Sequence, residues 1–222
     1  MSDGVTPIIE SLIDAHGGAI ISAGLRGDLP NDVLDSASDL VAALRDQVAI
    51  GRQIEADRGE LNAKRDLLPG AGFDRLWREA HEDARDKTVA AETAAERTYA
   101  RLEAALQRSL LPEFSPGREQ FARDEAALAL SSGDPEYAVR NLALYGGDEP
   151  IGALFSPWGQ TLLRAHGIEN ADTILKEARA IVVRRKSASD SPAAEAIRHH
   201  LGPLAAAKGS ASNLARSFTG NR

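Results

Sequence analysis

The five histidines are the side chains of this 222-residue sequence best suited to bind a metal ion or to transfer a proton near neutral pH. His81 draws most interest, because Glu79, Glu82, Asp83 and Asp86 surround it in a predicted helix. A di-iron carboxylate site in a helical bundle needs Glu-x-x-His on each of two helices and further glutamates that point inward. That spacing does not occur here, so we interpret the cluster as a solvated acidic surface and predict no metal site.

Other chemistries lack their defining residues. The absence of cysteine excludes disulfides, thiolate nucleophiles and cysteine-based metal sites. The phosphate-binding patterns G-x-x-x-x-G-K-[ST] and G-x-G-x-x-G and the G-x-S-x-G elbow of serine hydrolases do not occur either. His199 and His200 are adjacent, and neighbouring helical residues point apart, so we do not expect them to chelate one ion together. The sequence therefore predicts no catalytic residues, no cofactor and no enzyme activity; an enzyme built from scattered carboxylates and His81 would require bound metal.

The stretch LRAHGIENADTILKEA, residues 163–178, predicts a helix, a glycine turn and a second helix, as in a DNA-binding helix-turn-helix. With Gly167 as the turn glycine, Leu163 takes a position that is usually small. Glu169 and Asp172 would repel phosphates at the start of the recognition helix. We interpret the stretch as a packing corner whose inward-facing residues are Leu162, Leu163, Ile174 and Leu175.

Charge is spread unevenly along the chain. The net charge of -7 belongs to residues 1–111, with 13 basic and 20 acidic side chains, whereas residues 176–222 hold nine basic and three acidic ones. A basic end of this kind is typical of an ordinary solvated segment or of a segment that contacts nucleic acid or an acidic partner. The residues that would contact phosphate are Arg184, Arg185, Lys186, Arg198, Lys208, Arg216 and Arg222. Because no aromatic side chains are interleaved with them, we favour the solvated segment.

The N-terminal residues give an expectation about compartment. They lack the basic start of a secretory signal and carry Asp3, Glu10 and Asp14 among their apolar side chains. No uninterrupted apolar run approaches the roughly 18 residues of a membrane span. We therefore expect a cytoplasmic protein without membrane contacts.

Composition favours helices as the elements that position these residues. Aromatic residues make up only 5% of the chain, and alanine and leucine supply most of its apolar side chains. This predicts an all-α fold. We expect a short helix and turn in residues 1–30, with a helix that Gly17 and Gly18 end, and a long helical hairpin in 31–111. A bundle of short helices in 112–186 and a basic linker, short helix and tail in 187–222 follow.

The hairpin is predicted from two long apolar patterns separated by the turn sequence LPGAG, residues 68–72. The first pattern alternates steps of four and three residues, as the seam of a helix does, and consists of Val33, Ala37, Leu40, Leu44, Gln47, Gly51, Ile54, Arg58 and Leu61. The second pattern, residues 73–111, repeats every eleven residues, which gives a straight helix roughly 58 Å long at 1.5 Å per residue. Such a rod either folds back on its own chain or binds partner helices. The apolar stripe that would bind a partner consists of Phe73, Trp77, Ala84, Ala91, Ala95, Tyr99, Leu102 and Leu106.

After Pro112 the sequence changes to short helices that proline starts and glycine ends. We predict helices over 116–132, 135–145, 157–166, 171–186 and 192–201. Their large apolar residues are expected to form the core of the bundle, among them Phe121, Leu128, Tyr137 and Leu144. Residues from Lys208 onward are predicted to form a polar tail that is mobile unless a partner orders it.

These observations together predict a non-enzymatic structural or assembly protein. It would act through helix-helix contacts with itself or with other proteins, in a homo-oligomer or in a larger particle such as a virion. The alternative is a regulatory or nucleic-acid-binding adaptor that uses the basic C-terminal segment.

Overall fold

The computed structural model describes residues 4–67, 70–113, 115, 117–131 and 133–219. These residues form helices and turns and no β-strand, which confirms the predicted all-α class. They divide into two compact units. Unit 1 combines residues 1–105 with 196–222, and unit 2 consists of 106–195. The predicted N-terminal helix, the hairpin up to residue 105 and the last part of the chain therefore belong to the same unit.

The N-terminal helix of unit 1 is continuous. It consists of α1 (Val5–Leu12), a π-turn labelled η2 (Ile13–Gly17) and α2 (Gly18–Leu25). The prediction that Gly17 and Gly18 end this helix was wrong. Gly17 is buried, and a Cβ atom at this position would lie 2.3 Å from Cγ2 of Val41. The glycine therefore allows a close approach to the next helix and does not end its own.

Among the described helices, the continuous stretch Val5–Leu25 is long and apolar enough to cross a membrane by length and composition. Its two acidic side chains, which interrupt the apolar run in the sequence, both pair with the neighbouring helix. Glu10 lies 2.9 Å from Arg52, and Asp14 lies 2.8 Å from Arg45. In unit 1 the charged side of this helix therefore packs against the helix of the same chain that carries Arg45 and Arg52.

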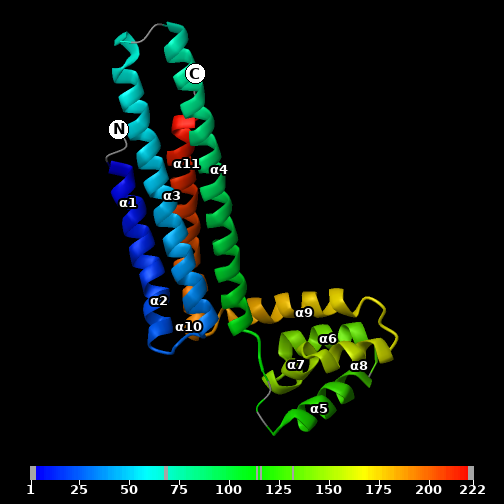
Figure 1. The fold of residues 1–222 in the computed structure, drawn as a ribbon. Coiled ribbons are helices and arrows are strands. Elements are labelled where there is room, and N and C mark those ends of the chain that lie inside the picture. Colours follow the sequence, from blue (N-terminus) through cyan, green and yellow to red (C-terminus); the bar gives the residue numbers. More distant parts are fainter. Residues whose placement is uncertain (1–3, 68–69, 114, 116, 132, 220–222) are drawn as a thin grey trace. The chain divides into compact units, whose positions relative to one another are not determined.

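The long hairpin is present as predicted. It consists of α3 (Asn31–Ala63), a 3-10 turn (Arg65–Leu67) and α4 (Gly70–Ser109), which run antiparallel (Figure 1). Residues 68 and 69 of the predicted turn lie outside the described residues, and the rest of that turn is the first part of α4. The seam of α3 is buried as its four-three spacing indicates. Its buried residues include Val33, Ala37, Leu40, Leu44, Gln47, Gly51 and Ile54.

The C-terminal segment is helical where a mobile tail was predicted. After α10 (Pro192–Ala196) and a second π-turn labelled η4 (Ile197–Leu201), α11 runs over Gly202–Thr219. The helix that was expected to end near residue 201 therefore continues well beyond Lys208. Its buried side is made mostly of small residues: Leu204, Ala207, Ala211, Leu214 and Ala215.

Small residues let α11 lie close beside α3 in unit 1 (Figure 1). A Cβ atom on Gly51 would lie 3.2 Å from Leu214, and Gln47 Nε2 donates a 2.8 Å hydrogen bond to Ser212 Oγ. Gln47 and then Gly51 of α3 meet Ser212 and then Leu214 of α11, so the two helices run parallel. Figure 1 shows α11 lying between α3 and α4.

Unit 2 is a bundle of short helices, as predicted. One of them, α7, was missing from the prediction. The helices are α5 (Glu119–Ser131), α6 (Pro135–Tyr145), α7 (Asp148–Phe155), α8 (Pro157–Ala165) and α9 (Ala171–Lys186). Their shared core includes Leu130, Val139, Ile151, Leu154, Leu163, Ile174, Leu175 and Val182.

Four residues predicted for this core are exposed instead. The exposed fractions are 56% for Phe121, 72% for Leu128, 64% for Tyr137 and 43% for Leu144. In α5 the small residues Ala122 and Ala126 point inward together with Leu130, which places the larger side chains on the opposite side. Size alone was therefore a poor guide to burial in this short helix.

The predicted packing corner at residues 163–178 is confirmed. Gly167 has a φ angle of +83°, the left-handed conformation that ends a helix, and Ile168 N–H donates a 3.1 Å hydrogen bond to the Leu163 carbonyl. Leu163, Ile174 and Leu175 are buried, and Leu162 packs against them half-buried.

Candidate functional site

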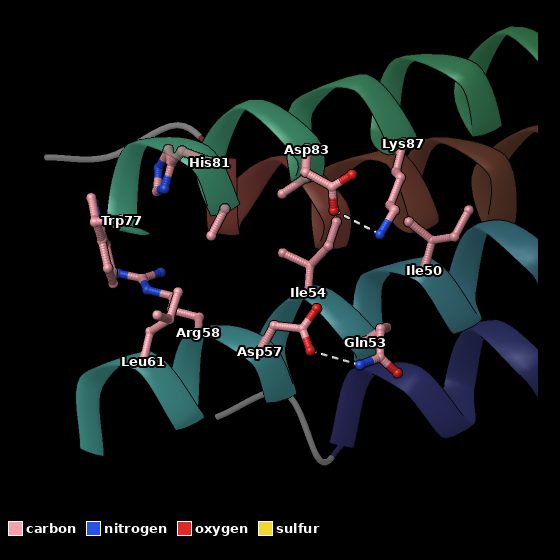
Figure 2. A pocket seen from close by; sticks show the side chains of 12 residues that line it. Ile50, Gln53, Ile54, Asp57, Arg58, Leu61, Trp77, His81, Asp83 and Lys87 are labelled. Carbon is pink, nitrogen blue, oxygen red and sulfur yellow. Dashed lines mark hydrogen bonds and ion pairs between the residues drawn. The ribbon is translucent and has the colours of Figure 1, made fainter. Parts of the chain in front are cut away.

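A pocket of about 230 Å³ lies between the second half of α3 and the first half of α4 (Figure 2). It is called the tip pocket here because it opens near the turn of the hairpin. The residues that line it are Ile50, Gln53, Ile54, Asp57, Arg58, Leu61, Trp77, Ala80, His81, Asp83, Ala84 and Lys87.

The pocket exists because the hairpin is longer than the helices that cover it. Figure 1 shows α3 and α4 continuing past the ends of α1 and α11. Lower in unit 1, the apolar side of α4 is closed by α3 and α11, and Ala95 and Leu102 are fully buried. Near the turn the same side of α4 faces α3 across a gap, and Trp77 and Ala84 are half-exposed. Among the described residues, only side chains of α3 and α4 line the tip pocket.

Apolar side chains form the floor of the tip pocket, and one end is aromatic. Ile54 is buried with 6% of its surface exposed, and Leu61 is half-buried. The Trp77 ring lies 5.6 Å from the Phe73 ring and 5.3 Å from the His81 ring, measured between centroids. These rings form a short row along α4, of which Trp77 and His81 line the pocket.

Arg58 of α3 reaches across to this aromatic row. Its guanidinium carbon lies 5.8 Å from the centre of the Trp77 ring, within range of a cation-π interaction (Figure 2). The arginine and the tryptophan come from opposite helices. This contact therefore ties α3 to α4 at the end of the pocket nearest the turn.

Charged and polar groups of both signs form the rim. Lys87 lies 2.7 Å from Asp83, and Gln53 Nε2 donates a 2.7 Å hydrogen bond to Asp57 (Figure 2). The hydrogen bond that Lys87 donates to Asp83 and the negative charge of that carboxylate raise the pKa of Lys87 above its usual value of 10.5, so the lysine stays a cation at neutral pH. Each rim pair lies within one helix, which leaves the pocket open between them.

The side chains around the pocket do not form a nucleophile with an adjacent base. Among the described residues of the whole chain, no group of three or more His, Cys, Asp or Glu could hold a metal ion. His81 lies beside Trp77 at the apolar wall, although acidic residues surround it in the sequence. The pocket volume also falls below the roughly 300–1,000 Å³ that small-molecule sites enclose.

The predicted partner-binding stripe divides into two parts. Phe73, Trp77 and Ala84 are half-exposed at the tip. The other stripe residues are covered by the chain itself: Ala91, Ala95, Leu102 and Leu106 are buried, and Tyr99 is half-buried. Tyr99 also donates a 3.4 Å hydrogen bond to the Leu201 carbonyl. Of the part of the stripe in α4, only Phe73, Trp77 and Ala84 at the tip and Tyr99 are therefore partly exposed.

The α3 side of the pocket was not proposed as a site from the sequence. Ile54, Arg58 and Leu61 were recognised only as members of the helix seam. These three residues continue the seam of α3 toward the turn of the hairpin, and this was the signal that the sequence offered. The signal could not identify a pocket, because the mostly small and polar residues of α11 do not show which part of α3 that helix covers.

The basic residues predicted to contact phosphate are mostly paired with carboxylates. In unit 1, Arg216 donates two 2.7 Å hydrogen bonds to Glu92, and Lys208 pairs with Glu96. In this unit the acidic surface of α4 therefore supplies the counter-charges of α11. Arg198 is exposed, and Arg222 lies outside the described residues.

The remaining three of these residues belong to unit 2. Lys186 lies 2.5 Å from Asp148, and Arg185 lies 3.9 Å from the same carboxylate and donates a 3.1 Å hydrogen bond to the Gly146 carbonyl. Arg184 is exposed. Nucleic-acid binding through these cations stays a prediction, and it would require several of them to exchange carboxylates for phosphates.

Comparisons with protein-family models, with curated proteins and with solved structures found no match for this chain. No relative therefore indicates a substrate or a partner for the tip pocket. Its role has to be inferred from the apolar floor, the aromatic wall and the mixed charges of its rim.

Proposed function

We propose that the chain is a non-enzymatic assembly protein whose hairpin tip binds a helix of a second copy. The observation that carries this proposal is the tip pocket itself, an apolar gap between α3 and α4 that continues the surface covered by α11 lower in unit 1. A helix from another chain would bury the same kind of residues there. Burial of apolar surface supplies the free energy of such an association, about 25 cal/mol per Å².

Trp77 is the expected centre of this contact. Tryptophan residues at the middle of an interface often dominate the binding free energy, because they bury a large surface with little loss of side-chain freedom. Trp77 is already held by its contacts with Phe73, His81 and Arg58. An ordered anchor of this kind loses little further freedom when a partner binds.

The charges of the rim favour a second copy as the partner. The tip carries Arg58 and Lys87 as well as Asp57 and Asp83. In a two-fold symmetric dimer each surface meets its own image, so a surface with both signs can place opposite charges against each other. A surface of a single sign would repel its copy.

The molar mass in solution tests this proposal. We expect light scattering at micromolar concentration to give a multiple of the 23.6 kDa chain mass. Trp77→Ala should shift the protein to monomer and leave its helical content unchanged. Tyr145→Ala is the matched control, because Tyr145 is an 81% exposed aromatic residue of unit 2 and its loss should not change the mass. A wild-type monomer throughout the concentration range would overturn the homo-oligomeric form.

A further inference from the structure

The turn of the long hairpin carries an exposed leucine. Leu67 ends the 3-10 turn Arg65–Leu67, and 80% of its surface is exposed. No other large apolar side chain among the described residues of unit 1 is as exposed. Leu67 lies close to the tip pocket along the chain, since Leu61 already lines that pocket. The same end of the hairpin therefore has an apolar projection and an apolar hollow.

The tip pocket has room for a leucine side chain. Its volume is about 230 Å³, whereas an apolar cavity of about 150 Å³ already accepts a benzene molecule. Leu67 does not line the pocket of its own chain. It follows Ile54, on the pocket floor, by thirteen residues, which is roughly 20 Å along a helix at 1.5 Å per residue. The hollow and the projection are thus separated along the hairpin.

A separation of this kind is what a two-fold symmetric contact needs. An axis halfway between a projection and a hollow places each projection in the hollow of the other copy. The midpoint between Ile54 and Leu67 lies beside Leu61, and Figure 2 shows Leu61 and Trp77 at the same end of the pocket. With the axis at that level, the two Trp77 rings meet at the centre of the contact, and Leu67 of each copy reaches the level of Ile54 and Ala84 of the other.

The charges of the two surfaces are complementary in this arrangement. Residues 64–66 of the turn hold two basic side chains and one acidic one. The part of the pocket that they would face holds Asp57, together with Asp83 and Lys87, which neutralise each other at 2.7 Å. Arg65 and Asp57 are each four residues from Leu61, on opposite sides of the axis. The two-fold operation therefore sets a guanidinium against a carboxylate twice in each dimer.

We propose that the tip pocket accepts Leu67 of a second copy, in a symmetric dimer whose hairpin tips overlap antiparallel over roughly 20 Å. This inference rests on the proposed function and names the segment of the second copy that the tip binds. That segment is the end of the hairpin itself, from the last turn of α3 to Leu67. Arg65 pairs with Asp57 of the second copy at both edges of the contact.

Disulfide crosslinking tests the arrangement directly, because the chain has no cysteine of its own. We expect an equimolar mixture of Leu67→Cys and Ala84→Cys, treated with oxidised glutathione, to give a covalent dimer that contains one chain of each variant. Either variant alone should stay uncrosslinked, because the axis keeps each position roughly 20 Å from its counterpart and a disulfide needs Cα atoms within about 7 Å. The control mixture pairs Ala84→Cys with Leu25→Cys, a leucine of unit 1 that is 74% exposed, and should give no covalent dimer.

Sedimentation equilibrium measures the contribution of the same residues to self-association. Leu67→Glu should weaken the dimer by about tenfold or more, because it removes the apolar side chain that the pocket buries. Arg65→Asp should weaken it as well, and the charge exchange in Arg65→Asp/Asp57→Arg should restore affinity to within about threefold of wild type. Leu25→Glu is the matched control and should leave the dimer unchanged. Circular dichroism checks that each variant keeps its helical content.

The outcomes separate this inference from the proposed function. A wild-type dimer that Leu67→Glu does not weaken, or whose cysteine mixture does not crosslink, would overturn the arrangement and leave the proposed function standing. A double variant as weak as Arg65→Asp would contradict the pairing of Arg65 with Asp57. A wild-type chain that stays monomeric at every concentration would overturn both proposals.

Discussion

The first half of α4 and its second half carry the same apolar stripe, but their neighbours differ. Around Ala95 and Leu102 the stripe is completely buried between α3 and α11, whereas around Trp77 and Ala84 it is half-exposed beside the tip pocket. The helical period decides which side of α4 is apolar. The lengths of α1 and α11 decide how much of that side the chain covers itself. An amphipathic helix can therefore be fully buried along one half and partly exposed along the other.

The largest expected difference in stability is between replacing a leucine of the covered region, Leu102 of α4, and replacing one at the hairpin tip, Leu61 of α3. Leu102→Ala should lower the free energy of unfolding by about 2–5 kcal/mol, because Leu102 is fully buried and its loss leaves a cavity. Leu61→Ala at the half-exposed tip should cost only about 1 kcal/mol. Urea denaturation followed by circular dichroism measures both. Equal losses would show that the tip is as tightly packed as the covered half.

A smaller difference in stability is expected between replacing Gly17 and replacing the adjacent Gly18 by alanine. Gly17→Ala should destabilise the protein by about 1–3 kcal/mol, because the new methyl group would lie 2.3 Å from Val41. A Cβ atom at Gly18 would meet no other part of the protein within 4 Å. Gly18→Ala should therefore stabilise the helix by about 0.5–1 kcal/mol. Thermal unfolding of the two variants should therefore shift in opposite directions. An increase in melting temperature for Gly17→Ala would contradict the close contact between η2 and α3.

The smallest effect should appear at alkaline pH. Burial raises the pKa of Tyr99 above 10.0, and the negative charges of Glu103 and Glu96 add to this. The unfolded chain loses this proton first, so the contribution of Tyr99 is complete below about pH 10 and disappears as the pH rises through the pKa of the folded state.

Unfolding midpoints measured from about pH 9 to 11 test this behaviour. Tyr99→Phe should lose less stability over that range than wild type. Lys87 at the tip also has a raised pKa, owing to Asp83, but it is exposed and screened by solvent. Lys87→Met should therefore follow the wild-type curve. A wild-type curve as flat as that of Tyr99→Phe would rule out the effect.

The sequence was most informative where the pattern of apolar residues is long. Four-three spacing predicted the seam of α3, and the eleven-residue repeat predicted α4 almost to its ends. The corner at Gly167 could also be predicted, because a glycine between two short amphipathic patterns ends the first of them. In each case the residues that determine the element are close together in the sequence.

Prediction failed where burial depends on distant partners. Gly17 has the local character of a helix end, and only its contact with Val41 explains why the helix continues. α11 has few large apolar residues, and its signal is the four-residue spacing of Ala207, Ala211 and Ala215. The tip pocket was predicted only from its α4 side, through Trp77 and Ala84 of the stripe, because the pocket joins residues of two separate helices.

The discontinuity of unit 1 has a consequence for the order of events during protein synthesis. Unit 2 is one uninterrupted stretch of chain and can fold as soon as it leaves the ribosome. Unit 1 must wait, because α11 is made only after all of unit 2. Until then the apolar sides of α3 and α4 that α11 will cover are open to water and to other nascent chains. Contacts between segments so far apart in the sequence are slow to form, so this interval is when premature association is most probable.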